Sequence, residues 1–472
     1  MENFWDSSVW GSINLFAVLL FSLLVAYMIK KSIPFLKNAL LPTSVFGGII
    51  LLIISAVYTG VTGNLFFDLD FFGGNGVNAL EIITYHALAL GFIAQSLKTT
   101  DKKMNKKRAT EIFNTGVTTV STYLLQGVFG LAITIFIAAV ILPEFFPAAG
   151  VLLPFGYGQG SGQALNYGNI YQKDYGFVGG RSFGLSVAAL GFLSASIGGV
   201  IYLNILKKKG KFKRGALTNE ALTLDQIQDK DEVPFTGSID KLTTQIALVA
   251  VAYGFTYGAM MLLGKLLPNM RSVIFGFNFL FGVLFATLLK VILNGLKNKK
   301  MVNRRYTNNF LLTRISNTFF DIMIVAGIAA IRIDIIKQYW AILLILGLVG
   351  LIITYIYNIF VAKVLFKDYQ EEQFLAMYGM LTGTASTGIM LLREKDPDFK
   401  TPVADNLVYQ NFPAIVFGFP MMILATLAPK EPVLTLIILA AFFIVMNIIL
   451  FRSFIFKKLK HKTDKECVEK SE

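Results

Sequence analysis

Apolar windows of about 20 residues, the length of helix that crosses a bilayer, recur along the whole chain between short polar segments. The chain is 55% hydrophobic and 15% charged, with a mean hydropathy of +0.62. It therefore has too few polar side chains to cover the surface of a soluble protein of this size. The sequence predicts an all-α integral membrane protein.

Eleven of these windows are predicted to span the membrane. They cover residues 10–29, 42–60, 78–97, 111–142, 176–206, 239–266, 272–293, 310–331, 339–365, 402–427 and 433–451. The first window follows an acidic N-terminus, which is not typical of a cleaved signal peptide, and we expect it to remain as a helix. The single cysteine, Cys467, excludes a disulfide framework.

Lysine and arginine cluster after every odd-numbered window and in the tail, for example at 98–108, 207–214 and 297–305. The alternate loops are acidic or nearly neutral. Because basic loops stay on the cytoplasmic side, we expect a multi-pass protein with its N-terminus outside and its C-terminus in the cytoplasm. The net charge of +14 then reflects topology in a lipid bilayer, and no nucleic-acid partner is expected.

The first five windows (1–206) and the next five (239–429) enter the membrane in opposite orientations, which predicts two inverted repeats. The loop between them, 207–238, is predicted to be a solvated cytoplasmic linker, basic at its start and acidic later. Its acidic residues are Glu220, Asp225, Asp229, Asp231 and Glu232. An extra transmembrane helix (430–456) and a basic cytoplasmic tail (457–472) complete the chain.

Two glycine-rich polar stretches interrupt the apolar pattern, each between the fourth and fifth windows of its half. They are 154–168, with glycines at 156, 158, 160 and 162, and 381–388. Glycine in a helix interior costs about 1 kcal/mol relative to alanine, and non-helical backbone at membrane depth is found only inside protein or around a water-filled cavity. We therefore expect two re-entrant hairpins, at about 147–172 and 370–394, as in many secondary transporters.

The tips of such hairpins can bind both an anion and a cation. Helix N-termini present unpaired N–H groups and a positive dipole to an anion, whereas free carbonyls and hydroxyls can coordinate sodium. The candidate substrate-binding residues are Gly158, Gln159, Gly160, Ser161, Gly162, Gln163, Thr382, Gly383, Thr384, Ala385, Ser386 and Thr387. The alternative is that these small residues only let helices pack closely.

Asp321 lies near the middle of the eighth window, one turn beyond Asn317 on the same helix face. A carboxylate at that depth is costly unless it is paired, protonated or bound to an ion. Asp321 and Asn317 are therefore candidate sodium ligands, together with hairpin carbonyls. Asp321 could instead accept a coupling proton or pair with Arg314 two turns earlier.

Other ionisable residues have ambiguous roles. Arg393, beside the second glycine-rich stretch, could bind a substrate carboxylate through two hydrogen bonds or could serve only to set topology. Arg181, at the start of the fifth window, has the same two explanations. Glu81 is expected near the outer surface, and His86 is expected to be a hydrogen-bonded core residue.

Several catalytic signatures are missing from the sequence. It has no phosphate-binding loop of the GxxxxGK[ST] type, no HExxH, no paired CxxC and no GxSxG elbow. We therefore expect neither an enzyme nor an ATP-driven pump, and no cofactor apart from sodium as the coupling ion.

The chain resembles the bacterial sodium/glutamate symporter family at these same stretches. The likeness covers Gly158–Ala164, the Tyr175-Gly-Phe-Val-Gly-Gly and Ala188-Ala-Leu-Gly-Phe segments, Gly198-Gly199, Ser316–Met323 and Gly379–Met390, in the same order over roughly residues 10–428. The resemblance implies two inverted repeats of five spans, each with a re-entrant loop. It also implies sodium-coupled uptake of glutamate across the bacterial plasma membrane and, by extension, a homodimer.

Two departures from the family pattern bear on the substrate. The first hairpin of the family usually has a Gly-His-Gly-Thr-like core, where this chain has Gly158-Gln159-Gly160-Ser161. The second usually has Thr-Pro-Thr-Ala, where this chain has 383–387, Gly-Thr-Ala-Ser-Thr. Glutamate or a similar small anionic amino acid is the expected cargo. The alternatives are a sodium- or proton-coupled carrier of another carboxylate or amino acid and, less favoured, a channel or a non-transporting membrane receptor.

Overall fold

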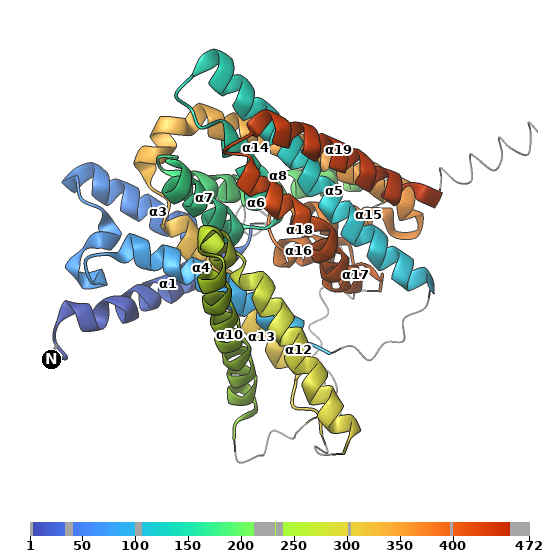
Figure 1. Ribbon diagram of the computed structural model, residues 1–472, viewed down its shortest axis with the longest axis horizontal. Helices are drawn as coiled ribbons and strands as arrows, with labels where there is room; N and C mark the ends of the chain where they lie inside the picture. Colours follow the sequence, from blue (N-terminus) through green and yellow to red (C-terminus); the bar gives the residue numbers. More distant parts are fainter. Residues whose placement is uncertain are drawn as a thin grey trace, which may run out of the picture. The chain divides into compact units, whose positions relative to one another are not determined.

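The computed structural model describes residues 3–33, 41–99, 106–211, 232, 239–300, 304–396 and 400–453. Its described residues form helices and their connections, and the only β-pairing among them is an isolated bridge between Glu232 and Arg305. The fold is therefore the predicted all-α architecture (Figure 1). The predicted tail, 457–472, and nearly all of the linker 212–238 lie outside the described residues.

The helices group into two compact units, each drawn from three parts of the chain. Unit 1 comprises Met1–Lys103, Gln159–Ala189 and Ala216–Leu343, and unit 2 comprises Met104–Gly158, Leu190–Gly215 and Leu344–Glu472. Each unit therefore contains helices from both predicted repeats.

Unit 1 contains α1 (Ser7–Ser32), α3 (Thr43–Thr62), α4 (Gly76–Ser96), α7 (Ser161–Tyr175), α10 (Lys241–Leu266), α11 (Arg271–Gly276), α12 (Asn278–Asn298) and α13 (Asn309–Ala329). Unit 2 contains α5 (Lys106–Phe136), α6 (Leu152–Gly158), α15 (Gln370–Thr382), α16 (Ala385–Lys395), α17 (Val403–Tyr409), α18 (Asn411–Leu427) and α19 (Pro432–Leu450). Two helices, α8 (Gly180–Lys208) and α14 (Ile333–Leu365), run through both units.

Ten helices of the described chain are long and apolar enough to cross a membrane, and a bent pair raises the number to eleven. The pair covers 403–409 and 413–427 and bends by 49°. Proline explains the bend, because Pro413 has no N–H to donate back to residue 409. The chain is thus a multi-pass membrane protein. The window predicted at 272–293 is interrupted at Phe277, between α11 and α12.

Unit 1 is built around α4 and α13. α13 packs along α4 and α3, α12 packs on α4, and α10 packs on α12. A Cβ on Gly91 of α4 would lie 2.7 Å from the Phe320 ring, so this glycine makes room for the phenylalanine of α13. The Ser316 hydroxyl donates to the Gly91 carbonyl at 2.9 Å and fixes the same contact. Apolar residues of α4, α10, α12 and α13 form a buried cluster close by.

Unit 2 is built around α5, which packs along α19 and α18 and against α6 (Figure 1). α15 and α16 pack against each other. Their contact is close, because a Cβ on Gly388 would lie 2.4 Å from the Ala376 carbonyl oxygen. The helices joined at Gly383 and Thr384 therefore fold back on each other.

The linker prediction is wrong at Glu232. This residue is 2% exposed rather than solvated. Its carboxylate oxygens lie 2.9 Å from Lys241 Nζ and 2.9 Å from Arg305 Nη2, and they accept a hydrogen bond of 2.5 Å from Asn308 Nδ2. Removing one member of a buried charge network costs about 3–5 kcal/mol, so Glu232 holds the linker against the start of α10 and the residues before α13.

The glycine pair at residues 130 and 150 gives a direct test of the packing in unit 2. A Cβ on Gly130 would lie 2.2 Å from the Gly150 carbonyl oxygen, whereas a Cβ on Gly127, one turn earlier in α5, would have its nearest neighbour at 3.5 Å. We expect Gly130→Ala to lower the thermal unfolding midpoint of the detergent-solubilised protein by several degrees. Gly127→Ala should leave it unchanged or raise it, because alanine favours a helix by about 1 kcal/mol over glycine. Equal effects of the two substitutions would contradict this packing.

Candidate functional site

The first glycine-rich stretch is a break between two helices, as predicted. α6 ends at Gly158 and α7 begins at Ser161. Gly160 has φ 83° and ψ −177°, a backbone conformation that residues other than glycine rarely adopt. The first N–H groups of a helix have no partner inside it, and Gly160 supplies no side-chain cap to those of α7. Gln159, beside it, is half-buried.

Two buried side chains at the start of α7 have unused polar atoms. Ser161 and Gln163 are each 1% exposed, yet Ser161 Oγ and Gln163 Nε2 have no hydrogen-bond partner among the described residues. The Ser161 hydroxyl faces α13, where it lies 3.1 Å from the position of a Cβ on Gly327. Leaving a buried polar group unpaired costs about 1–3 kcal/mol, so these atoms point to a ligand or an ordered water.

The Gln163 amide is oriented by its neighbours. Asn166 Nδ2 donates to the Gly276 carbonyl at 3.2 Å and to Gln163 Oε1 at 3.4 Å. Since Gln163 Oε1 accepts from Asn166, the unpaired Nε2 remains as a donor next to the helix N-terminus. Gly162 also needs to be glycine, because a Cβ there would lie 2.8 Å from Leu88 of α4.

The second break uses its hydroxyls differently. Thr384 caps α16, with its Oγ1 accepting from the Thr387 amide at 3.4 Å. The Thr382 hydroxyl donates to the Tyr378 carbonyl at 2.6 Å. The predicted threonines thus serve first to close the ends of their own helices. Gly383 is buried and Ala385 is half-buried, whereas the side chain of Ser386 lies outside the described ones.

Arg393 lies far along α16 from this break. It is eight positions after Ala385, and at 1.5 Å per residue that is about 12 Å along the helix axis. It is exposed and belongs to the last turn, where a cation stabilises the helix dipole. The structure therefore does not bring Arg393 together with Thr384 at the break.

The predicted sodium ligands lie on α13. Asp321 and Asn317 are both exposed and share one face, as their spacing predicted. The alternative ion pair of Asp321 with Arg314 is not among those of the described residues, and the Arg314 guanidinium lies 5.0 Å from the Phe310 ring centroid instead. The Ser44 hydroxyl of α3 lies beside the Asp321 carboxylate without forming a hydrogen bond.

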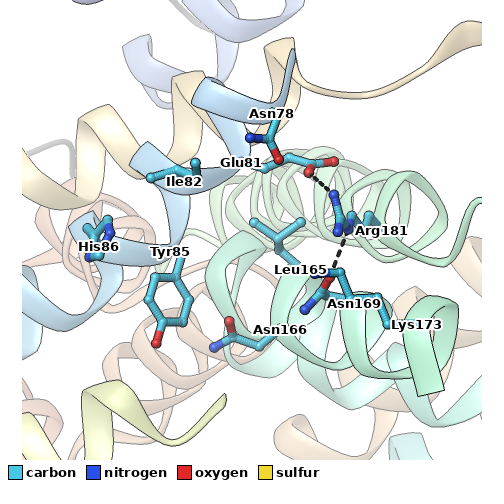
Figure 2. A pocket seen from close by; sticks show the side chains of 10 residues that line it. All are labelled: Asn78, Glu81, Ile82, Tyr85, His86, Leu165, Asn166, Asn169, Lys173 and Arg181. Atoms are coloured by element: carbon cyan, nitrogen blue, oxygen red, sulfur yellow. Dashed lines mark hydrogen bonds and ion pairs between the residues drawn. The ribbon is translucent and has the colours of Figure 1, made fainter. Parts of the chain in front are cut away.

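The sequence did not predict a polar pocket along α7 (Figure 2). It has a volume of about 400 Å³ and is lined by α4, α7 and Arg181 of α8. Arg181 Nη1 lies 2.5 Å from Glu81 Oε2, and Arg181 Nε donates to Asn169 Oδ1 at 2.9 Å. Figure 2 shows this guanidinium between Glu81 and Asn169. The sequence did contain a sign of this pair, because Glu81 and Arg181 carry opposite charges and were both predicted at the outer side of the membrane.

A second cavity of about 610 Å³ shares Asn78, Glu81 and Arg181 with this pocket. Leu165 of α7 lines the first pocket one helical turn after Ser161. The two cavities therefore extend along α7 from near its buried N-terminus to the region around Gly176.

A polar stripe on α5 was also missed. The buried residues on this stripe are Thr115, Thr118, Thr119, Thr122 and Gln126. Apart from the adjacent Thr118 and Thr119, they are spaced by three or four residues, which places them on one helix face. Their partners include Thr354, Gln373 and Gln410 of the same unit. Averaging hydropathy over a long window hides such a stripe, although its period was readable in the sequence.

In comparisons with known proteins, no family model matches the chain and no curated protein matches it. Within the described residues, no group of three or more His, Cys, Asp or Glu side chains is arranged to hold a metal ion. Sodium coordination by neutral oxygens needs no such group.

The Glu81–Arg181 pair should be measurably coupled. The two side chains are only 11% and 20% exposed, so we expect a double-mutant cycle with Glu81→Gln and Arg181→Gln to give a coupling energy of about 1–3 kcal/mol. The control is Arg332 with Asp334, which lie 2.9 Å apart but are 49% and 57% exposed; their coupling should stay below about 1 kcal/mol. Chemical unfolding in mixed micelles measures both. Equal coupling in the two pairs would contradict the burial of Glu81 and Arg181.

Proposed function

We propose that this chain is a secondary active transporter that takes up glutamate, or a similar small anionic amino acid, together with sodium. The observation that carries the proposal is the buried N-terminus of α7, with unpaired donors at Ser161 and Gln163. A buried helix N-terminus with extra donors favours a carboxylate. Alternating access around the two helix breaks would be the mechanism, with a hairpin-bearing part moving against a fixed scaffold.

The donors at this end of α7 have no anionic competitor on the helix itself. The first turn of α7 contains no acidic residue. The Gln163 amide presents its N–H groups because Asn166 occupies its oxygen. A substrate carboxylate would therefore meet a hydroxyl, an amide and the free backbone N–H groups of one helical turn.

The cavities along α7 begin one helical turn beyond this position, at Leu165 and Asn166. Their volumes of about 400 and 610 Å³ exceed that of a small amino acid. Glu81, Arg181 and Lys173 give the smaller pocket charges of both signs, which suits a substrate carrying both an ammonium and a carboxylate group.

The proposal includes further elements. The orientation and the inverted repeats come from the sequence, whereas the bacterial membrane and the homodimer come only from the family resemblance. The N-terminus is outside and the C-terminus is cytoplasmic in a bacterial plasma membrane, because basic residues follow the odd-numbered spans. The helix breaks are re-entrant hairpins of two inverted repeats. The working form is a homodimer.

Uptake into liposomes tests the function. The purified chain is reconstituted and offered labelled glutamate, aspartate, citrate and a neutral amino acid, with imposed sodium or proton gradients. We expect glutamate uptake only with an inward sodium gradient, and a proton gradient alone should not replace it. Flux independent of both gradients would indicate a channel and exclude a symporter, and uptake driven by protons alone would replace sodium as the coupling ion.

Ser161→Ala tests the position of the substrate. It removes the unpaired hydroxyl, so we expect the KM for glutamate to rise about tenfold, equivalent to about 1.4 kcal/mol of lost binding. Ser186→Ala is the matched control, because Ser186 is also buried but donates to the Ser182 carbonyl at 2.7 Å. If both variants transport like the wild type, the carboxylate does not bind at the start of α7.

Asp321→Asn tests the predicted sodium ligand. The substitution keeps the size of the side chain and removes its charge, so we expect the sodium concentration for half-maximal uptake to rise about tenfold. Asp334→Asn is the control, since Asp334 is exposed and paired with Arg332. Unchanged sodium dependence in Asp321→Asn would make Asp321 a structural residue.

A further inference from the structure

Three buried amides of unit 2 show the same imbalance of hydrogen bonds. Gln126, Asn358 and Gln373 are each at most 2% exposed. In all three the amide nitrogen donates, to Thr354, Thr122 and Thr115 respectively. The oxygens Gln126 Oε1, Asn358 Oδ1 and Gln373 Oε1 accept no hydrogen bond within the part of the chain that the structure describes. The unpaired atoms of these three amides are all oxygen acceptors, so a ligand that binds to them is a donor or a cation.

Gln126 has the best-defined surroundings of the three. Its Nε2 donates to Thr354 Oγ1 at 2.8 Å and to the Leu381 carbonyl at 2.9 Å, which fixes the amide orientation and leaves Oε1 as the unpaired atom. This oxygen lies 3.3 Å from the position of a Cβ on Gly158. It therefore lies against the last residue of α6.

Two helices end around this oxygen. α6 ends at Gly158 and α15 ends at Thr382, and the two helices contact each other within unit 2. The last four carbonyls of a helix have no intrahelical donor and carry its negative dipole end. Of these, the Gly158 carbonyl receives one hydrogen bond of 3.0 Å from the Tyr123 hydroxyl, and the Leu381 carbonyl receives the one from Gln126. Each carbonyl oxygen keeps a second lone pair.

We infer that Gln126 Oε1, with carbonyl oxygens at the ends of α6 and α15, forms a binding site for a monovalent alkali cation. All these ligands are neutral oxygens, which hard cations prefer. A divalent ion would leave two charges uncompensated in a buried place, whereas one charge is balanced in part by two helix ends. The role of the site in coupling rests on the proposed function, but cation binding itself does not.

The location suits coupling to the proposed substrate. Gly158 is followed by Gln159 and Gly160, and α7 starts at Ser161. The cation would bind at the carbonyl end of one break and the anion at its amide end, three residues further along the chain. Binding of either ion can then order the same short connection, and such linkage raises both affinities by the same factor.

Cation binding is measured without substrate on the purified full chain in detergent. Sodium chloride replaces choline chloride at constant ionic strength, with potassium and lithium chloride as parallel arms, and the thermal unfolding midpoint is recorded. A ligand of the native state raises the midpoint in a saturable way. We expect saturable stabilisation by at least one alkali cation, and the arms identify which one.

Two substitutions of Gln126 and one control decide the assignment. Gln126→Leu removes the oxygen, and the half-saturating cation concentration should rise at least about tenfold. Gln126→Glu keeps an oxygen and adds charge, and the same concentration should fall about tenfold at pH 8. Gln410→Leu is the control, because Gln410 is a buried glutamine of unit 2 whose Oε1 already accepts from Thr119 at 2.8 Å; it should keep the wild-type cation dependence.

The outcomes separate this site from the proposed function. No saturable cation effect on the wild type, or an effect unchanged in both Gln126 variants, would overturn the site and leave ordered water as the partner of Gln126 Oε1. If Gln126→Leu does not fold, Gln126→Glu alone decides. Sodium-driven uptake that survives in Gln126→Leu would refute the role of the site in coupling while the transport function stands. Cation binding lost in Gln126→Leu without any uptake by the wild type would support the site and reject transport.

Discussion

A backbone N–H or C=O at membrane depth must find a partner inside the protein, since lipid offers none. Continuous helices meet this requirement over most of the chain. At the two breaks, particular side chains have to supply the missing hydrogen-bond partners. At the carbonyl ends, α5 supplies the partners, with Tyr123 donating to Gly158 and Gln126 donating to Leu381. At the start of α7, the donors of Ser161 and Gln163 are left over. The break therefore leaves donors unused at the start of α7, whereas its carbonyl end keeps only acceptors, namely Gln126 Oε1 and the second lone pairs of the carbonyls.

Charged side chains buried in the protein need partners for the same reason. The deeply buried ion pairs of the described chain involve the linker residue Glu232 with Lys241 and Arg305, and the partly buried pair of Glu81 and Arg181 lies in the pocket along α7. Around the breaks, the buried polar groups are hydroxyls, amides and carbonyls. Neutral groups cost less to bury than charges, so the breaks present polar atoms at membrane depth without buried ionised side chains.

Most of the fold could be predicted because crossing a bilayer leaves a long, simple signal. Most windows were found within a few residues, apart from the interruption at Phe277, and both breaks were found from polar, glycine-rich stretches between apolar windows. The predictions that failed concerned side chains whose partners are far away in the sequence. Glu232 looks like any solvated acid until Lys241 and Arg305 are folded around it, and Glu81 and Arg181 are 100 residues apart. The α5 stripe was readable from its period, but each threonine bonds its own helix, as Thr122 does with Thr118, so composition did not reveal its role.

The two breaks also explain why sequence alone could not rank the candidate residues. All the hydroxyls at the breaks are chemically similar, and only geometry separates Thr382 and Thr384, which bond their own helices, from Ser161, which does not. At a capped helix end, the group that could bind a substrate is already hydrogen-bonded within the protein. In the proposed transporter, the uncapped α7 end would therefore contribute more to substrate affinity than the capped α16 end. The second break would then act mainly through the carbonyl end of α15, where Gln126 donates to Leu381.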